Sequence, residues 1–364
     1  EAFYATFYEK PEIGSVDLVE VNPGVEPRFT DQQFITTVTM TEEGDPESTK
    51  TFDAYVEGSI FADTQWVEPL QSSMSVSGQW NGLSSVSNKF GRVCHGEGKY
   101  VAVSTAGSNP SNNIAYSYNG TSWDYITVPS TNGFKDVAFG NGYFVIIARQ
   151  AAGESSVLVS DDGFTWTRVT TPVTQLDVAW TRISFNNGLF MVFDQNDDYM
   201  YSTDAFNWVK STVPGVGWSG AAYGDNKWVA VSNINKSSSS TNQIMYSVDG
   251  VNWTLVAAPV DRNWVSVAYG SGKFVALAKS ATADKLVMYS TDGINWSSSE
   301  AATSNIWSQM VYGDGKFVAV AGRGPDAAMY SLDGINWTTS TPPQNDWEGI
   351  AFGTTATSGL AGDA

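Results

Sequence analysis

Short runs of apolar residues alternate with polar turn segments along most of the chain. In a typical stretch, Trp264-Val-Ser-Val-Ala-Tyr269 is followed by Gly-Ser-Gly and then by the apolar run that ends at Leu277. Aromatic and β-branched residues dominate such runs, and Gly, Ser, Asp and Asn fill the turns, which is typical of strands joined by tight hairpins. The pattern predicts four strands here, at residues 264–269, 273–277, 286–290 and from 296 onward.

This four-strand pattern recurs at a nearly constant spacing. The motif Tyr-Ser-x-Asp-Gly-x-Asn-Trp occurs at Tyr246–Trp253, Tyr289–Trp296 and Tyr330–Trp337, and weaker copies precede these. The copies end at Trp80, Trp123, Trp166, Trp208, Trp253, Trp296 and Trp337, which are 41 to 45 residues apart. A second element, an aromatic residue followed by alternating residues and a Gly turn, begins at Phe90, Phe134, Trp180, Trp218, Trp264, Trp307 and Trp347. Units of this length match the blades of a β-propeller.

The two elements are out of step at the ends of the repeat region, and this predicts how the ring closes. The copy that ends at Trp80 has no aromatic element before it, and the element at Trp347–Gly353 has no tryptophan copy after it. We therefore predict an all-β fold, a seven-bladed β-propeller of four-stranded blades over residues 66–364, closed by a split blade. In that blade, residues 74–84 would pair with Trp347–Phe352, which would also protect edge strands.

Residues 1–65 lie outside the repeat. Apolar and polar residues alternate at 34–40 and 51–56, and an acidic, turn-like segment separates these two stretches. We predict a small N-terminal β arm that acts as an adaptor. The chain begins at Glu1 without Met, which points to processing or to an unrecorded start.

The repeated residues have a structural explanation. An Asp-Gly pair between two strands is a strong hairpin signal, because both turn positions accept positive φ, and Asp249, Asp292 and Asp333 can bond to backbone amides of their own turns. We expect the repeated tryptophans to pack between neighbouring blades. The aromatic residues that open the innermost strands have two interpretations: packing between blades, which we favour, or a ring at the channel mouth that stacks on sugars.

The repeat resembles the Asp-box, Ser-x-Asp-x-Gly-x-Thr-Trp, of sialidase-like propellers, with one residue fewer between Asp and Gly. It is more similar still to the repeats of bacteriophage virion and tail-associated propeller proteins. The resemblance covers roughly residues 72–353. It implies a propeller and a location in a virion or another extracellular particle, but enzymes, lectin-like binders and scaffolds all use such repeats.

Composition limits the partners. A formal net charge of −19 disfavours nucleic acid, which requires clustered Lys and Arg. No apolar run is long enough to predict membrane insertion. The single cysteine, Cys94, cannot form a disulfide within the chain. We expect no cofactor.

A sialidase-like active site would need three arginines around the substrate carboxylate, in addition to acidic residues. The chain has only seven arginines, and Arg149, Arg182, Arg262 and Arg323 are the candidates for such a cluster. We favour the alternative that these arginines are scattered over the surface, and we expect no catalytic residues.

Two further groups of residues suggest chemistry. Cys94 and His95 could form a nucleophile pair or bind a metal, but adjacent residues on a strand point to opposite faces, so packing roles are favoured. The loop Asp194-Gln-Asn-Asp-Asp198 offers carboxylates to Ca²⁺ but lacks the Gly and the distal Glu of an EF-hand loop. We interpret it as a solvated acidic loop and expect no metal site.

The connections between strands differ on the two sides of a blade. Turns that join first to second strands and third to fourth strands are tight and uniform, and they emerge on one side. The connections on the other side vary, as at residues 233–242, 261–263 and 323–326. Variable loops on a rigid frame usually carry recognition, so we place any ligand at that mouth, with Arg262, Asn263, Trp264 and Arg323 as candidates.

These observations favour a non-enzymatic structural or adhesion protein of an extracellular assembly, in particular a bacteriophage virion component. Its arm would dock to other virion or assembly proteins, and its mouth could contact a host-surface glycan or receptor. Two alternatives stay open: a glycan-processing enzyme of sialidase-like fold and a free carbohydrate-binding, lectin-like module. Converging acids and arginines at the mouth would indicate the enzyme, and exposed aromatics with Asn and Asp would indicate the lectin.

Overall fold

The computed structural model describes thirteen stretches of the chain, which are residues 34–42, 45–56, 90–105, 113–120, 122–126, 128, 133–148, 157–172, 180–233, 243–280, 284–322, 326–340 and 348–353. The chain divides into two compact units. In one unit, β1 (Phe34–Glu42) and β2 (Asp45–Val56) form an antiparallel hairpin, which confirms the two strands predicted there. No helix that is long and apolar enough to span a membrane occurs in the described part of the chain.

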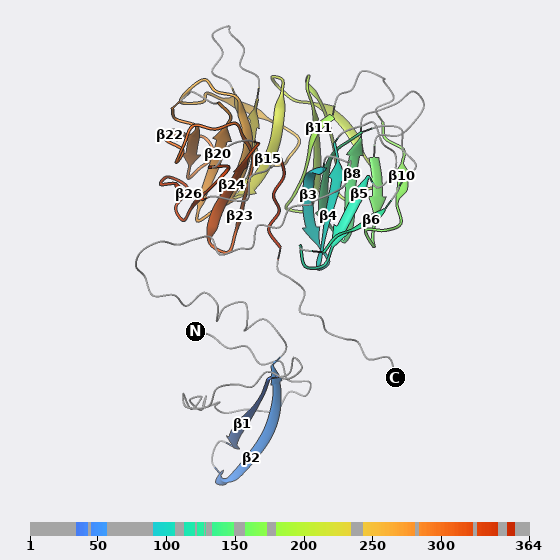
Figure 1. The fold of residues 1–364 in the computed structure, drawn as a ribbon, viewed down its shortest axis with the longest axis vertical. Helices are drawn as coiled ribbons and strands as arrows, with labels where there is room; N and C mark the ends of the chain where they lie inside the picture. Colours follow the sequence, from blue (N-terminus) through green and yellow to red (C-terminus); the bar gives the residue numbers. More distant parts are fainter. Residues whose placement is uncertain are drawn as a thin grey trace. The chain divides into compact units, whose positions relative to one another are not determined.

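In the other unit, the described residues form six antiparallel four-stranded sheets arranged as the blades of a propeller (Figure 1). Consecutive strands of a blade are neighbours in its sheet, and the first strand of each blade is innermost, next to the first strand of the following blade. The first three blades are β3 (Phe90–Gly96), β4 (Lys99–Ser104), β5 (Ile114–Ser117) and β6 (Asp124–Ile126); β7 (Phe134–Gly140), β8 (Tyr143–Ala148), β9 (Val157–Ser160) and β10 (Thr167–Val169); β11 (Trp180–Asn186), β12 (Leu189–Asp194), β13 (Asp198–Ser202) and β14 (Val209–Thr212). The last three are β15 (Trp218–Gly224), β16 (Lys227–Ser232), β17 (Ile244–Ser247) and β18 (Thr254–Val256); β19 (Trp264–Gly270), β20 (Lys273–Ala278), β21 (Val287–Ser290) and β22 (Ser297–Ser299); β23 (Trp307–Gly313), β24 (Lys316–Ala321), β25 (Ala328–Ser331) and β26 (Thr338–Ser340).

The prediction of seven blades is wrong, because the residues that the structure describes form six. The last aromatic element does not begin a seventh sheet: its described residues 348–353 are extended but form no strand (Figure 1). Its proposed partner segment, residues 74–84 with Trp80, lies outside the described residues, as does Trp347. The seven copies of each repeated element overestimate the number of blades, because a blade requires four hydrogen-bonded strands and one copy supplies only part of them.

Residues 348–353 nevertheless take an inner place between the sixth and first blades. A Cβ added at Gly313 of β23 would lie 2.1 Å from the Phe352 ring, and one added at Gly353 would lie 2.2 Å from the His95 ring of β3. The same contact between a glycine and the aromatic residue of the next inner strand joins Gly96 to Phe139, Gly140 to Phe185, Gly224 to Tyr269 and Gly270 to Tyr312. The ring therefore has six blades and one further inner place, occupied by residues 348–353.

Two features of the inner strands were not anticipated. Every described inner strand has a β-bulge directly after its first residue, seen as a shift of register against the second strand, as between Trp264 and Ser266. The two-residue turns with positive φ lie between first and second strands, as at Ser271 (φ 46°) and Gly272 (φ 70°), and not at the Asp-Gly pairs. In those pairs only the glycine has positive φ, so Asp-Gly was correctly identified as a turn but its type was wrong.

The repeated motif forms a turn that is closed by its own side chains. The Asp249 carboxylate accepts hydrogen bonds from the backbone amides of Val251 and Asn252, at 2.8 and 2.7 Å, and from the Asn252 side chain at 2.7 Å. The Ser247 hydroxyl donates to the same carboxylate and accepts the Gly250 amide. Asp292 and Asp333 make the same bonds, which confirms the structural role predicted for these aspartates.

These turns also join neighbouring blades. A Cβ at Gly250 would lie 2.6 Å from Leu189 of the preceding blade, and one at Gly293 would lie 2.8 Å from Val229. The Trp253 ring lies 6.0 Å from the Phe193 ring, also in the preceding blade. The expected inter-blade packing of the repeated tryptophans is thus confirmed at Trp253, although most described members, including Trp296, are only half buried.

The aromatic residues that open the innermost strands belong to the core. Five of the six described members have exposed fractions of 0–1%: Phe134, Trp180, Trp218, Trp264 and Trp307. The second strands are buried along almost their whole length, because a neighbouring blade covers each face of the sheet. The packing interpretation of the aromatic residues is therefore confirmed, and these five rings have no exposed face for a sugar.

Candidate binding surface

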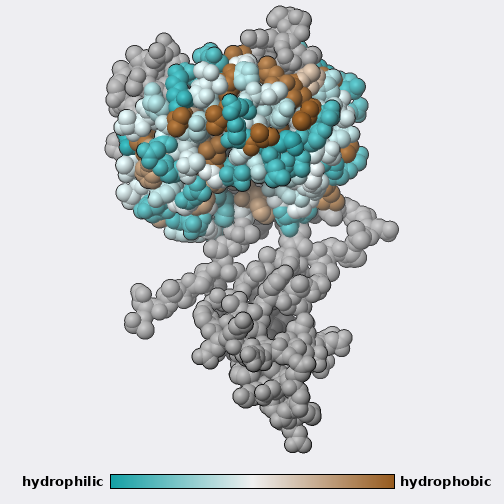
Figure 2. All heavy atoms as spheres, turned by 180° about the vertical axis from the view of Figure 1, so that it is seen from behind, coloured by the Kyte–Doolittle hydropathy of each residue, from teal (hydrophilic) through white to brown (hydrophobic). Residues whose placement is uncertain are grey.

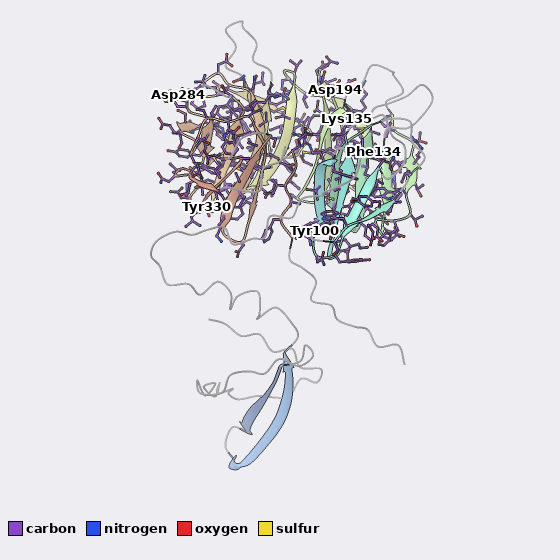
Figure 3. The ribbon with its side chains drawn as sticks, in the orientation of Figure 1. Tyr100, Phe134, Lys135, Asp194, Asp284 and Tyr330 are labelled. Atoms are coloured by element: carbon purple, nitrogen blue, oxygen red, sulfur yellow. The ribbon has the colours of Figure 1, made fainter. Side chains whose placement is uncertain are left out.

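The connections between second and third strands and between blades emerge at one end of the propeller, which we call the rim. The tight turns emerge at the other end, the turn face. In Figure 3, Asp194 and Asp284 lie towards the rim and Tyr100 towards the turn face.

Backbone hydrogen bonds connect several described rim loops of the third to sixth blades, which together we call the collar. The Gly217 amide donates to the Gln195 carbonyl of the preceding blade, and the Gly217 carbonyl accepts from Asn233 of its own blade, at 3.0 and 2.9 Å. The same arrangement recurs farther round, where Lys279 donates to Asn263 and Ser280 donates to the Asn305 carbonyl. A loop held by such bonds loses little entropy when it binds, so the collar is a preorganised part of the rim.

Two of the four predicted site residues, Arg262 and Asn263, contribute to this part of the rim. The Arg262 guanidinium lies 3.1 Å from an Asp284 carboxylate oxygen and also donates to the Asp284 and Asp261 carbonyls, which ties two rim loops together. Asn263 contributes its carbonyl to the collar, and Trp264 is fully buried. Arg323 lies outside the described residues.

The described members of the suggested arginine cluster have separate partners. Arg182, on β11, donates to the Ser219 carbonyl of the next inner strand at 3.2 Å, whereas Arg262 binds Asp284 in the rim. Arg149, like Arg323, lies outside the described residues. Arg182 thus joins adjacent inner strands.

A buried charged group that sequence reasoning missed lies beneath the rim. Arg92 of β3 donates from Nη1 to the carbonyls of Gly91 and Glu348, and its Nε lies 4.0 Å from the Asp136 carboxylate of β7. Asp136 is 7% exposed and accepts the backbone amides of Val137 at 2.9 Å and Ile183 at 3.2 Å. These contacts join three inner strands and residues 348–353.

The electrostatics of this group follow from burial. Burial raises the pKa of Asp136 to about 6, although the Arg92 charge and the two backbone amides act in the opposite direction. Burial also lowers the pKa of Arg92, which Asp136 and Glu348 partly offset. Both Asp136 oxygens already accept backbone hydrogen bonds, so this carboxyl is engaged in holding strands together.

Cys94 and His95 lie on opposite sides of β3, as their adjacency predicts. Cys94 packs with the apolar cluster formed by the first two blades, and burial together with the Asp136 charge raises the pKa of its thiol, which lowers its nucleophilicity. The His95 ring packs over Gly353 and against the Tyr100 ring, with centroids 4.6 Å apart. The two side chains therefore serve packing between different neighbours.

The acidic loop of the third blade is also engaged internally. Asp194 is buried, and its carboxylate accepts the backbone amides of Asn196 at 2.7 Å and Asp198 at 3.1 Å. Asp198 pairs with Lys210 at 2.9 Å. Among the described residues, no group of three or more potential ligands is placed to hold a metal ion. The Asp194 carboxylate thus caps its own turn and is buried, whereas we expected a solvated acidic loop.

Comparisons with known proteins show the fold alone. No family model and no curated protein matches the chain. Among solved structures, YCF48 bound to D1 peptide is similar at 15% identity with a TM-score of 0.50, over 69% of this chain and 80% of that chain. A chain of the mitotic checkpoint complex has 10% identity and a TM-score of 0.54, over 79% of this chain and 90% of that chain. The extracellular domain of BT4673 from B. thetaiotaomicron has 10% identity and a TM-score of 0.52, over 75% of this chain and 36% of that chain. The chain is a β-propeller.

Proposed function

We propose that this protein is a non-enzymatic binding and assembly protein that receives a protein partner on its rim. The observation that carries the proposal is the hydrogen-bonded collar, which holds loops of different sequence on a rigid frame. The chemistry-bearing groups beneath the rim, Arg92, Asp136 and Arg182, are engaged in joining inner strands.

The exposed chemistry of the rim suits a protein surface. In the described loops of the fifth and sixth blades it presents the exposed residues Lys279, Lys285, Asp284 and Ile306, and the Ile306 side chain is 46% exposed. A mixture of both charges with an apolar contact is typical of protein interfaces. Figure 2 shows the same mixed character on the described surface, with small brown apolar groups separated by teal residues. Propellers of similar fold include one solved with a bound peptide and one in a protein complex, which supports a protein partner in general.

The resemblance of the repeat to bacteriophage virion and tail-associated propellers motivates the finer part of the proposal. The assembly would be an extracellular particle, such as a virion, and the N-terminal arm would attach the propeller to it. The net charge of −19 is consistent with a soluble display domain that avoids nucleic acid.

The test compares two substitutions of exposed apolar residues on opposite ends. Tagged chain would be expressed in the organism that encodes it, and proteins that copurify in fixed ratio would be quantified by mass spectrometry. Ile306→Asp on the rim should abolish the stoichiometric partner, whereas Val248→Asp on the turn face, 67% exposed, should leave it unchanged. Loss of the partner with Val248→Asp alone, or with neither variant, would contradict binding at the rim.

A further inference from the structure

The turn between the third and fourth strands of the first blade differs from its counterparts at one residue. In the other five described blades an aspartate occupies this place, and these residues are Asp162, Asp204, Asp249, Asp292 and Asp333. The first blade has Asn119, which is exposed and is followed by Gly120. The residue after the aspartate or asparagine has positive φ in all six turns, so they share this backbone feature. The first blade thus places a neutral amide where the others place a carboxylate.

The side-chain oxygen of Asn119 accepts hydrogen bonds from two donors of its own turn. Oδ1 accepts the backbone amide of Ser122 at 2.9 Å and the hydroxyl of Ser117 at 3.2 Å. Donors directed at a carbonyl oxygen polarise the carbonyl bond and stabilise the negative charge that develops on the oxygen when a nucleophile attacks the carbon. The side-chain carbon Cγ of Asn119 is therefore activated towards nucleophilic attack.

The Ser117 hydroxyl also contacts a nucleophile next to this carbon. Its Oγ accepts the backbone N–H of Gly120 at 2.8 Å while the hydroxyl donates to Asn119 Oδ1. A hydroxyl that accepts one proton and donates another can pass a proton from the Gly120 nitrogen to the amide oxygen as these two groups react. Ser117 is 2% exposed, so packing holds the hydroxyl in place. Gly120 has no side chain to hinder its nitrogen.

We propose that Asn119 is a site of intramolecular deamidation, which converts its turn into a sixth aspartate turn. The Gly120 nitrogen bonds to Cγ of Asn119, and its proton passes through Ser117 to Oδ1. The bond between Cγ and Nδ2 then breaks, and the amide group leaves with that proton as ammonia, which gives a five-membered succinimide. Water adds at Cγ, the bond from Cγ to the Gly120 nitrogen breaks, and this nitrogen regains a proton. The net reaction consumes one water and releases one ammonia.

The hydrogen bonds of the turn also determine the product and the end of the reaction. Opening of the succinimide at Cγ gives aspartate, whereas opening at the backbone carbonyl gives isoaspartate. The donors Ser122 and Ser117 activate Cγ, so aspartate is the main product. In the equivalent turn, hydrogen bonds, first from the Asn252 backbone amide, hold the pKa of Asp249 below its usual value. An ionised carboxylate repels a nucleophile, so the aspartate turn does not react again at neutral pH.

The chain provides two internal controls for the rate of this reaction. Asn141 and Asn187 are also exposed and followed by glycine, but no described residue donates a hydrogen bond to the side-chain oxygen of either one. The folded full chain would be incubated at mildly alkaline pH, and mass spectrometry of its peptides would follow the replacement of NH₂ by OH. We expect Asn119 to react at least fivefold faster than Asn141 and Asn187. In urea, where the turn is lost, the three rates should become similar.

A serine variant tests the proton transfer. Ser117→Ala should slow the reaction at Asn119 at least fivefold and leave the rate at Asn141 unchanged. Ser247→Ala, which removes the equivalent hydroxyl of the fourth blade, is the matched control and should leave the rate at Asn119 unchanged.

Three results would overturn the proposal. One is a rate at Asn119 in the folded chain that is no higher than the rates at Asn141 and Asn187, a comparison that requires no variant. Another is a Ser117→Ala variant in which Asn119 reacts as fast as before or faster, since a turn that is merely loosened by the substitution would react faster. The third is isoaspartate as the main product at residue 119, identified by chromatography against synthetic peptides.

Discussion

Adding one methyl group at Gly270 should destabilise the protein far more than the same change at an open glycine. A Cβ at Gly270 would lie 2.1 Å from Cδ2 and 2.2 Å from Cγ of the Tyr312 ring. Such a separation is impossible for real carbon atoms, so either the ring or the strand must move by more than an ångström. The ring is held by Phe317 on one face, at 4.7 Å, and its hydroxyl lies 3.1 Å from the Ser271 hydroxyl.

The expected magnitude follows from the cost of overpacking. Inserting a methyl group into a filled core costs about 1–3 kcal/mol, and the rigid surroundings place Gly270→Ala near 3 kcal/mol. Gly322→Ala is the control, because a Cβ there meets no atom within 4 Å and the backbone has no positive φ. It should change the free energy of unfolding by less than about 0.5 kcal/mol, as open surface positions do.

Urea denaturation followed by tryptophan fluorescence would measure both variants. A double-mutant cycle with Tyr312→Ala isolates the contact: removing the ring should relieve the clash, so the double variant should be little less stable than Tyr312→Ala alone, with a coupling of about 2 kcal/mol or more. A Gly270→Ala protein as stable as the Gly322→Ala protein, or strictly additive effects in the cycle, would refute the close packing of inner strands.

Four further predictions concern the packing of the repeat, its turn aspartates, the buried carboxyl and the rim. Trp296→Ala should lower the free energy of unfolding by about 2–3 kcal/mol, which is less than the loss expected at a fully buried aromatic residue, and Asp292→Ala should lower it by about 1 kcal/mol. Urea melts in which Asp292→Ala is the more destabilising variant would contradict these roles. Hydrogen bonds hold the pKa of Asp249 below its usual value, and they hold that of Asp162 at about 2 despite its partial burial. The free energy of unfolding should therefore decrease as the pH falls from about 4 towards 2. Asp249→Asn should make this decrease smaller. The raised pKa of Asp136 has the opposite effect, because ionising this buried carboxyl disfavours the folded state. The free energy of unfolding should fall by on the order of 3 kcal/mol as the pH rises from about 4 to 6. Asp136→Asn should remove this change from urea melts. Arg262→Ala should change the free energy of unfolding by less than about 1 kcal/mol, because its partner Asp284 is exposed, and a larger loss in thermal melts would show that this pair anchors the collar.

The local chemistry of the repeat could be predicted from the sequence because it depends on near neighbours. The turn bonds of Asp249, the burial of Trp264 and the separation of Cys94 from His95 follow from turn chemistry and strand alternation. The number of blades could not be predicted in this way. The repeat shows which residues resemble an inner strand, but Trp347–Gly353 forms a sheet only if three further strands are present.

The buried pair of Arg92 and Asp136 illustrates a second limit. The two residues are 44 positions apart and occupy the third place of adjacent inner strands. A charged residue within an apolar strand was the available signal, but its partner depends on how blades are packed. The collar of the rim was hidden for the same reason, since its bonds join backbone atoms and leave no mark in the side-chain pattern.

The native mass of the protein, purified gently from the organism that encodes it, tests the proposed function most directly. We predict that the chain elutes in a particle much larger than its own 39.3 kDa, together with other proteins in fixed ratio, and that Ile306→Asp releases it. A chain that elutes alone at 39.3 kDa under all gentle conditions, with no partner in fixed ratio, would contradict a role in assembly.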